Sequence, residues 1–211
     1  MHKLSKALRV FGLLLLMSAL ALTVYNICED NRAKAISQEI VEILKEEHVP
    51  AELQGSVDKA DSVCLSEPKT RVPDYILNPE MAMPVKIVNG QEYVGMLSIP
   101  ELSLQLPVIN DWDYPKLKEA PCLYSGSAYL DNLVIMAHNY QSHFGKINTL
   151  SIGSQLTFTD MDDNIFHYQV VATELISPTS VDEVVNSQWN LTLFTCTIGG
   201  QSRIAVRCER I

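Results

Sequence analysis

A cysteine and an arginine near the C-terminus are spaced so that they can share one reaction site. The apolar, β-prone stretch 191–195 indicates a strand that ends at Cys196, and a turn with two glycines leads to a second strand that begins at Arg203. If these strands pair with Cys196 opposite Arg203, their Cβ atoms lie ~5 Å apart on one face. A guanidinium beside a thiol favours the thiolate, which is the nucleophile. The same register sets Arg207 opposite Thr192, roughly 13 Å along the strand. The pattern therefore predicts cysteine chemistry at Cys196.

A histidine supplies the candidate proton-handling group. The four apolar residues 133–136 indicate a buried strand, and His138 follows just past its end. Side chains at strand ends that open to solvent often belong to active sites. An imidazole with an unperturbed pKa near ~6.5 can donate a proton to a leaving amine at neutral pH. His143, in a loop or short helix after the same strand, is the alternative candidate.

These segments resemble the sortases, membrane-anchored cysteine transpeptidases of Gram-positive bacteria. The sortase signature Thr-Leu-x-Thr-Cys is matched by Thr192, Leu193, Thr195 and Cys196. The histidine segment of the family is matched by residues 134–138, which favours His138 over His143, and the strand arginine by Arg203. Residues 93–108 are similar to the opening hairpin of the sortase barrel. The resemblance covers about residues 90–211 and the N-terminal anchor, and it leaves the sub-class open between class B-like and class D-like.

The resemblance implies a mechanism and a set of roles. Cys196 would be the nucleophile that forms a thioester acyl-enzyme, and His138 the proton donor and acceptor. Arg203 would stabilise the oxyanion or the substrate, with Thr195 and Thr192 as supporting residues. The substrate would be a secreted protein with a C-terminal sorting signal of the LPXTG type. The acceptor would be an amino group of a peptidoglycan precursor or a pilin lysine, and no cofactor would be required.

Two other functional classes are open on the residues alone. One is a membrane-anchored cysteine protease, which would use the same residues but hydrolyse the acyl-enzyme. The other is a non-catalytic β-barrel module in which Cys196 is a structural cysteine, because a lone cysteine at the end of an apolar strand is structural more often than not.

The N-terminal segment predicts a membrane anchor. Lys3, Lys6 and Arg9 form a basic flank, residues 1–9, before an apolar run over residues 10–27. This run of roughly 18 residues reaches the lower limit for crossing a bilayer core. The positive-inside rule places the N-terminus in the cytoplasm and the rest of the chain outside, as a single-pass protein of the cell membrane. A cleaved signal peptide is the competing interpretation, with a cleavage site near Ala21.

The remaining chain divides into a stalk and a catalytic domain. Residues 28–84 are expected to form a helical stalk and connector. The helix is indicated by apolar residues at helical spacing in an amphipathic pattern, Ala33, Ile36, Ile40, Ile43 and Leu44. The connector is indicated by the polar, proline-containing stretch that follows. Residues 85–211 hold regularly spaced short strands, which indicate a mainly β sandwich or closed barrel. The sortase resemblance selects a closed eight-stranded β-barrel with short helices.

Composition excludes several functions. All 25 acidic residues but only 13 of the 16 basic ones follow position 26, which gives a net charge of about −12 there and argues against nucleic-acid binding. Neither a phosphate loop nor Cys/His zinc spacing is present. One acidic cluster resembles a calcium loop but is better explained as a hairpin turn; its members are Asp160, Asp162, Asp163 and Asn164. A Cys64–Cys122 disulfide is possible, whereas Cys208 and Cys196 are expected on opposite strand faces.

Overall fold

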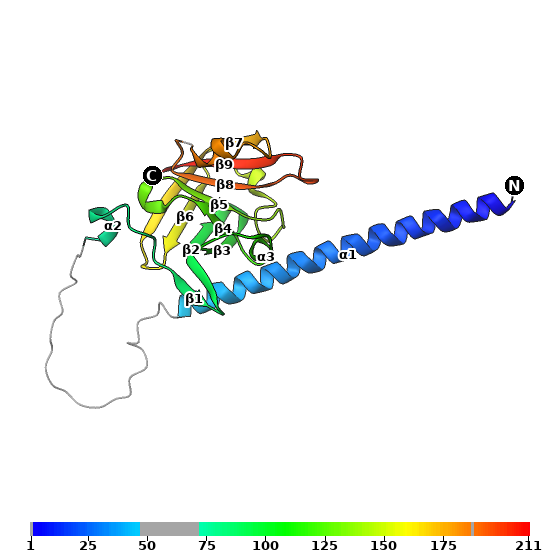
Figure 1. The fold of residues 1–211 in the computed structure, drawn as a ribbon, viewed down its shortest axis with the longest axis horizontal. Coiled ribbons are helices and arrows are strands. Elements are labelled where there is room, and N and C mark those ends of the chain that lie inside the picture. The colour runs from blue at the N-terminus through cyan, green and yellow to red at the C-terminus, as the bar shows by residue number, and fades with distance from the viewer. Residues whose placement is uncertain (1, 47–71, 187) are drawn as a thin grey trace, which may run out of the picture.

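The strands form one sheet that closes into a barrel (Figure 1). The computed structural model describes residues 2–46, 72–186 and 188–211. Its strands are β1 (Lys86–Val88), β2 (Gln91–Ile99), β3 (Leu104–Ile109), β4 (Cys122–Ser125), β5 (Leu133–Met136), β6 (Gln155–Asp160), β7 (Ile165–Ile176), β8 (Leu191–Cys196) and β9 (Arg203–Arg210). Its helices are α1 (His2–Glu46), α2 (Asp74–Leu77), α3 (Tyr114–Leu117) and α4 (Val181–Val185), with short 3-10 helices η2 (Pro100–Leu102), η3 (Ala128–Leu130) and η4 (Ile147–Thr149).

The topology confirms the predicted closed barrel. Among the described residues the strand order is β1-β2-β3-β4-β5-β8-β9-β7-β6, and pairing of β2 with β6 closes the eight strands β2 to β9. β1 forms a hairpin with β2 outside the closed ring. Apolar residues of the barrel strands meet in one core, to which β4 adds the partly buried Leu123, and Phe158, Phe166 and Tyr168 are among its largest side chains. The burial of this apolar surface is the main force that favours the closed barrel.

Strands β1 and β4 were not expected from the sequence. Cys122, the possible disulfide partner of Cys64, begins β4, which pairs antiparallel with β5 and parallel with β3. β4 has only four residues between Pro121 and Gly126, so it is too short for alternation to distinguish it from a loop. The Cys122 thiol is free and buried, and it donates to the Ala120 carbonyl at 3.6 Å. Cys64 lies outside the described residues.

Helix α1 is continuous from the apolar N-terminal run into the predicted amphipathic segment. It is long and apolar enough to cross a membrane, the only helix of the described residues with that property, and residues 13–27 are exposed. Beyond Ile27 the helix begins to pack on the barrel, where Ala33, Ile40 and Leu44 are buried against the region of β3. A long apolar helix of this kind is compatible with a single-pass anchor. Residues 47–71, which include most of the predicted connector, lie outside the described residues.

Polar contacts also join α1 to the segment that follows β5. The Asp30 carboxylate accepts hydrogen bonds from the Ser142 backbone N–H at 3.0 Å and from its hydroxyl at 2.5 Å. Ser37 donates to the Glu119 carbonyl at 3.0 Å, and its hydroxyl lies 3.4 Å from Nε2 of His143. His143 is therefore fully buried at the junction between α1 and the barrel.

The burial of His143 predicts a pH-dependent stability. Burial, with the nearby charge of His138, lowers the pKa of His143 from 6.5 to about 4. Between these values the unfolded chain binds a proton that the folded chain excludes, so stability decreases as the pH falls from 6.5 towards 4. The full contribution corresponds to about 3 kcal/mol of unfolding free energy.

The comparison to make is denaturant unfolding of the detergent-solubilised chain at several pH values, for the parent, His143→Gln and His167→Gln. His167 is exposed and serves as the control. We expect His143→Gln alone to flatten the pH dependence over this range. Parallel curves for the parent and His143→Gln would contradict the assignment.

Candidate active site

The ends of β5 and β8 and the start of β9 meet at one cavity. Cys196, His138 and Arg203 all line this cavity, whose volume is roughly 210 Å³. β5 and β8 are parallel neighbours with Met136 opposite Phe194, and the Ala137 N–H donates to the Phe194 carbonyl at 3.2 Å. His138 and Cys196 each lie two residues beyond that pair. The parallel register therefore brings the two strand ends, and both candidate side chains, to the same edge of the barrel.

A side-chain hydrogen bond fixes the two strand ends to each other. The Thr195 hydroxyl, which is buried, donates to the Ala137 carbonyl at 2.8 Å. Thr195 and Ala137 directly precede the nucleophile candidate and the histidine candidate. A threonine at this position thus restrains the relative position of Cys196 and His138.

The arginine candidate pairs with the cysteine as the sequence predicted. Cys196 is directly opposite Arg203 in the antiparallel β8–β9 ladder. The turn between them uses Gly199 and Gly200 at φ values of 85° and 73°, in the left-handed region that glycine adopts without strain. The Arg203 guanidinium donates from Nη1 to the carbonyls of Gly200, at 3.1 Å, and of Ser202, at 3.2 Å. The side chain thus lies along the turn at the rim of the cavity.

Arg207 has a different position and set of partners. It lies opposite Thr192, as predicted, and is buried. It donates to the Thr192 hydroxyl at 3.1 Å, to the Glu174 carboxylate at 3.0 Å and to the Glu183 carbonyl at 3.0 Å. Glu183 belongs to α4, so Arg207 fastens α4 and the segment before it to the barrel. That segment forms one wall of the cavity through Ile176, Ser177, Pro178 and Ser180.

The two histidines have separate environments. His138 is half-buried, and desolvation, followed by the positive charge of Lys118, lowers its pKa below the usual 6.5. The Tyr140 ring lies 5.0 Å from the His138 ring, centroid to centroid. The neutral form of His138 is therefore favoured in the free protein. His143 is placed under α1 and does not line the cavity.

An aromatic row forms the apolar side of the cavity and was not found from the sequence. The rings of Trp112 and Tyr124 lie 5.6 Å apart, and those of Tyr124 and Phe194 lie 5.1 Å apart with a perpendicular orientation. Met136 and Val184 add apolar surface. The only sequence signal for Trp112 is a tryptophan in a polar loop, where an exposed aromatic side chain often serves binding. This surface suits apolar side chains of a peptide.

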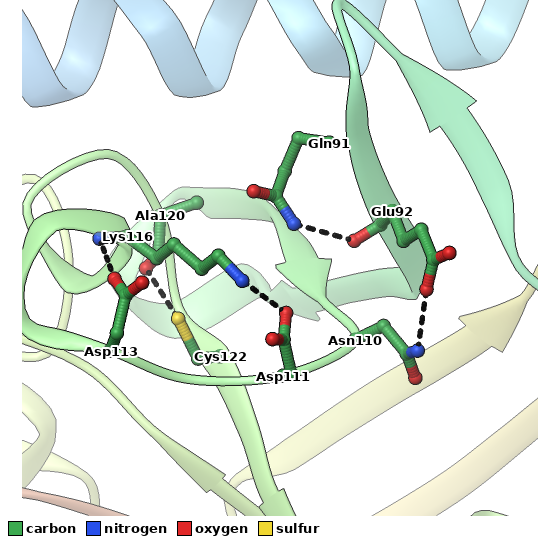
Figure 2. Close-up of polar contacts among 8 residues, drawn as sticks. All are labelled: Gln91, Glu92, Asn110, Asp111, Asp113, Lys116, Ala120 and Cys122. Carbon is green, nitrogen blue, oxygen red and sulfur yellow. Dashed lines mark hydrogen bonds and ion pairs between the residues drawn. The ribbon is translucent and has the colours of Figure 1, made fainter.

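Local polar contacts hold the loop that carries Trp112 (Figure 2). The Asp113 carboxylate caps α3 by accepting from the Lys116 backbone N–H at 2.7 Å. The Lys116 ammonium group forms an ion pair with Asp111 at 2.5 Å. At the start of the loop, the Asn110 side-chain amide donates to the Glu92 carboxylate at 2.9 Å. These contacts on both sides of Trp112 restrain its position over the cavity.

The acidic cluster forms the turn between β6 and β7. The Asp160 carboxylate accepts from the backbone N–H groups of Asp162 and Asn164, each at 2.9 Å. It also accepts from the Asn164 amide at 2.8 Å and from the Tyr129 hydroxyl at 2.6 Å. In the described part of the chain no group of three or more His, Cys, Asp or Glu residues is arranged to hold a metal ion.

Comparison with known proteins identifies the family. The sortase domain family model matches residues 97–211, which is more than half of the chain. The chain belongs to the sortase family. This confirms the resemblance that the cysteine, histidine and arginine segments indicated.

Solved sortase structures share the fold. Sortase A from Corynebacterium diphtheriae is 21% identical with a TM-score of 0.52, and the match covers 57% of this chain and 61% of that one. Sortase C from Streptococcus pneumoniae is 22% identical with a TM-score of 0.51, covering 59% of this chain and 70% of that one. This sortase therefore spans less than two thirds of the length of the C. diphtheriae chain. No match was found among curated proteins. Assignment to a class B-like or class D-like sub-class stays a prediction.

The half-buried position of His138 yields a titration prediction. Removing the Lys118 charge in Lys118→Ala should raise the pKa of His138 towards its usual 6.5, because one repulsion against the imidazolium is lost. Histidine NMR of the isotope-labelled chain in micelles reports the midpoint. Lys86→Ala, on β1, is the matched control because its charge does not act on His138. A parent midpoint above 6.5, or no change in Lys118→Ala, would contradict this account.

Proposed function

We propose that this sortase is a cysteine transpeptidase that cleaves an LPXTG-like sorting signal and transfers the protein to an amine. The observation that carries the proposal is the placement of Cys196, His138 and Arg203 around one cavity, at strand ends fixed by β5–β8 and β8–β9 pairing. Membership in the sortase family supports the reaction class. The apolar wall of Trp112, Tyr124 and Phe194 supports a peptide substrate with apolar side chains.

In the first half-reaction the thioester is formed. Neutral His138 accepts the Cys196 thiol proton, and the thiolate attacks the carbonyl carbon of the scissile threonine peptide bond. Arg203 leaves its exposed turn carbonyls and stabilises the oxyanion of the tetrahedral intermediate or the substrate carbonyls. The imidazolium of His138 then protonates the departing amine as the C–N bond breaks. The acyl group remains on the Cys196 sulfur.

In the second half-reaction an amine displaces the Cys196 sulfur from the acyl group. His138 removes a proton from the incoming amino group, which attacks the thioester carbonyl and forms a new amide. The proton returns to the thiolate as it leaves, so the enzyme is regenerated without a cofactor. The proposed acceptor is an amino group of a peptidoglycan precursor or a pilin lysine. Attack by water instead would make the enzyme a protease, the alternative function.

The proposed location follows from α1. We place residues 10–27 across the cell membrane, with the basic flank of Lys3, Lys6 and Arg9 in the cytoplasm and the barrel outside. The barrel then meets secreted proteins that carry sorting signals.

The decisive test is product analysis with the full-length chain in micelles. We expect incubation with LPXTG-like peptides and amines to yield a peptide joined to the amine, and a thioester adduct on Cys196 visible in the intact mass. Both should be absent in Cys196→Ala, whereas Cys28→Ala, a matched change at an exposed cysteine on α1, should retain them. Cleavage without joining would favour the protease. Absence of any adduct across a broad peptide library would favour the non-catalytic barrel.

Arg203 should act chiefly on the transition state. Removal of an oxyanion donor typically lowers kcat by about 10²–10³, so we expect a loss of this order in Arg203→Gln. Arg203→Lys keeps the charge but not the planar fork, and it should restore only part of the rate. Arg210→Gln, at the other end of β9 beside Asp131, is the control. A change confined to KM in Arg203→Gln would assign the residue to ground-state binding instead.

A further inference from the structure

The continuity of α1 fixes where the barrel lies relative to the apolar helix segment. The apolar run ends at Ile27, and the helix proceeds without a break to residues that pack on the barrel, the first fully buried one being Ala33. Six helical residues correspond to ~9 Å along the axis. The barrel therefore begins within about two helical turns of the apolar segment. This argument rests on the proposed function, because it uses the proposed membrane span.

The end of the barrel nearest the apolar segment is the end that holds the cavity. Asp30, only three residues or ~4.5 Å beyond Ile27, binds Ser142 through both its backbone N–H and its hydroxyl. Ser142 is four residues from His138. In Figure 1 the β8–β9 turn points in the same direction as the N-terminal half of α1, and the C-terminus lies at the opposite end of the barrel.

Two strongly exposed side chains flank α1 at this level. Ile198, two residues after Cys196, is 96% exposed and lines a second cavity together with Thr23, Asn26 and Ile27 of α1. Tyr114, at the start of α3 and at the rim of the catalytic cavity, is 72% exposed and lies beside Glu29 and Arg32. Exposed apolar side chains that occur singly need no explanation. Here both lie next to the helix turns where the proposed span ends.

We propose that Ile198 and Tyr114 form a membrane-contact surface that rests on the headgroup region of the bilayer crossed by α1. Tyrosine prefers the membrane–water interface because its ring is apolar and its hydroxyl stays hydrated. Transfer of an isoleucine side chain out of water is favourable because the side chain is apolar. The catalytic cavity would then open at the lipid surface, between these two contacts.

The test is lipid quenching of single-tryptophan variants of the full-length chain in phosphatidylcholine vesicles with or without brominated acyl chains. Trp112→Phe and Trp189→Phe remove the native fluorophores, and Cys196→Ala makes the result independent of catalysis. Tryptophan is then introduced by Ile198→Trp or Tyr114→Trp. The matched control is Ile211→Trp, an exposed position eight residues after Arg203 and ~27 Å along β9 from the cavity end.

We expect brominated lipid to reduce Ile198→Trp and Tyr114→Trp emission about twofold and to leave Ile211→Trp unchanged. Equal quenching at Ile198 and Ile211, or none at either, would overturn the surface. If brominated lipid has no effect and the introduced tryptophan instead becomes shielded from solvent as the protein concentration rises, the surface contacts a second copy of the chain. That result would also overturn the proposal.

One further variant separates failure of the surface from failure of the proposed location. Leu20→Trp, in the exposed apolar run, reports whether α1 is inside the bilayer. If Leu20→Trp is quenched and Ile198→Trp is not, only the membrane-contact surface is wrong. If neither is quenched, the membrane span and the surface are both wrong, and the transpeptidase activity in micelles remains a separate question.

Discussion

The parallel pairing of β5 with β8 is the constraint on which the rest of the site depends. These strands end side by side, so the residues that follow them reach the same edge of the barrel without any further contact. A shift of one residue would move every side chain of a strand to its other face. Leu191 and Leu193 of β8 pack in the main core, whereas Thr192, on the other face, accepts a hydrogen bond from Arg207, and a shift would exchange these two environments. The Thr195–Ala137 hydrogen bond adds a local restraint at the point where regular pairing gives way to the loop after β5.

In the proposed mechanism, the site must combine an apolar wall, which disfavours charge, with groups that exchange protons. Burial lowers the pKa of His138 and keeps the imidazole neutral at rest. A neutral imidazole is suited to accept a thiol proton, and the imidazolium formed is then beside the leaving amine that needs it. The cost of desolvation is thus confined to the charged intermediate, when the thiolate or oxyanion is present to offset it. An imidazolium held permanently in this cavity would lack such a partner.

Much of this arrangement was predictable because its signals are local. The β8–β9 register follows from a two-glycine turn between two apolar runs, and the position of His138 follows from an adjacent apolar strand. The extent of α1 was harder to predict, since a change from uniformly apolar to amphipathic pattern suggests a boundary although the backbone hydrogen bonds continue through it. β4 has too few residues to show the alternation of apolar and polar side chains that identifies a strand. Trp112 reaches the cavity from the loop after β3, and Tyr124 reaches it from the short strand β4. The Arg203 contacts with its own turn depend on a side-chain rotamer.

In the proposed mechanism, the balance between transfer to an amine and hydrolysis depends on how the barrel is held as well as on its residues. Water can also attack an exposed thioester. An amine therefore outcompetes water only if the effective concentration of the amine at the thioester carbonyl on Cys196 is high. Asp30, Ala33 and Leu44 fix the C-terminal part of α1 to the barrel, and in the proposed topology a helix fixed in this way would transmit the orientation of the membrane to the cavity. An acceptor confined to the membrane surface would diffuse in a thin layer and not through the whole solution. This confinement raises its effective concentration at the cavity without any new contact. The packing of α1 on the barrel is in this sense part of the proposed catalytic apparatus, although none of its residues touches the reacting atoms.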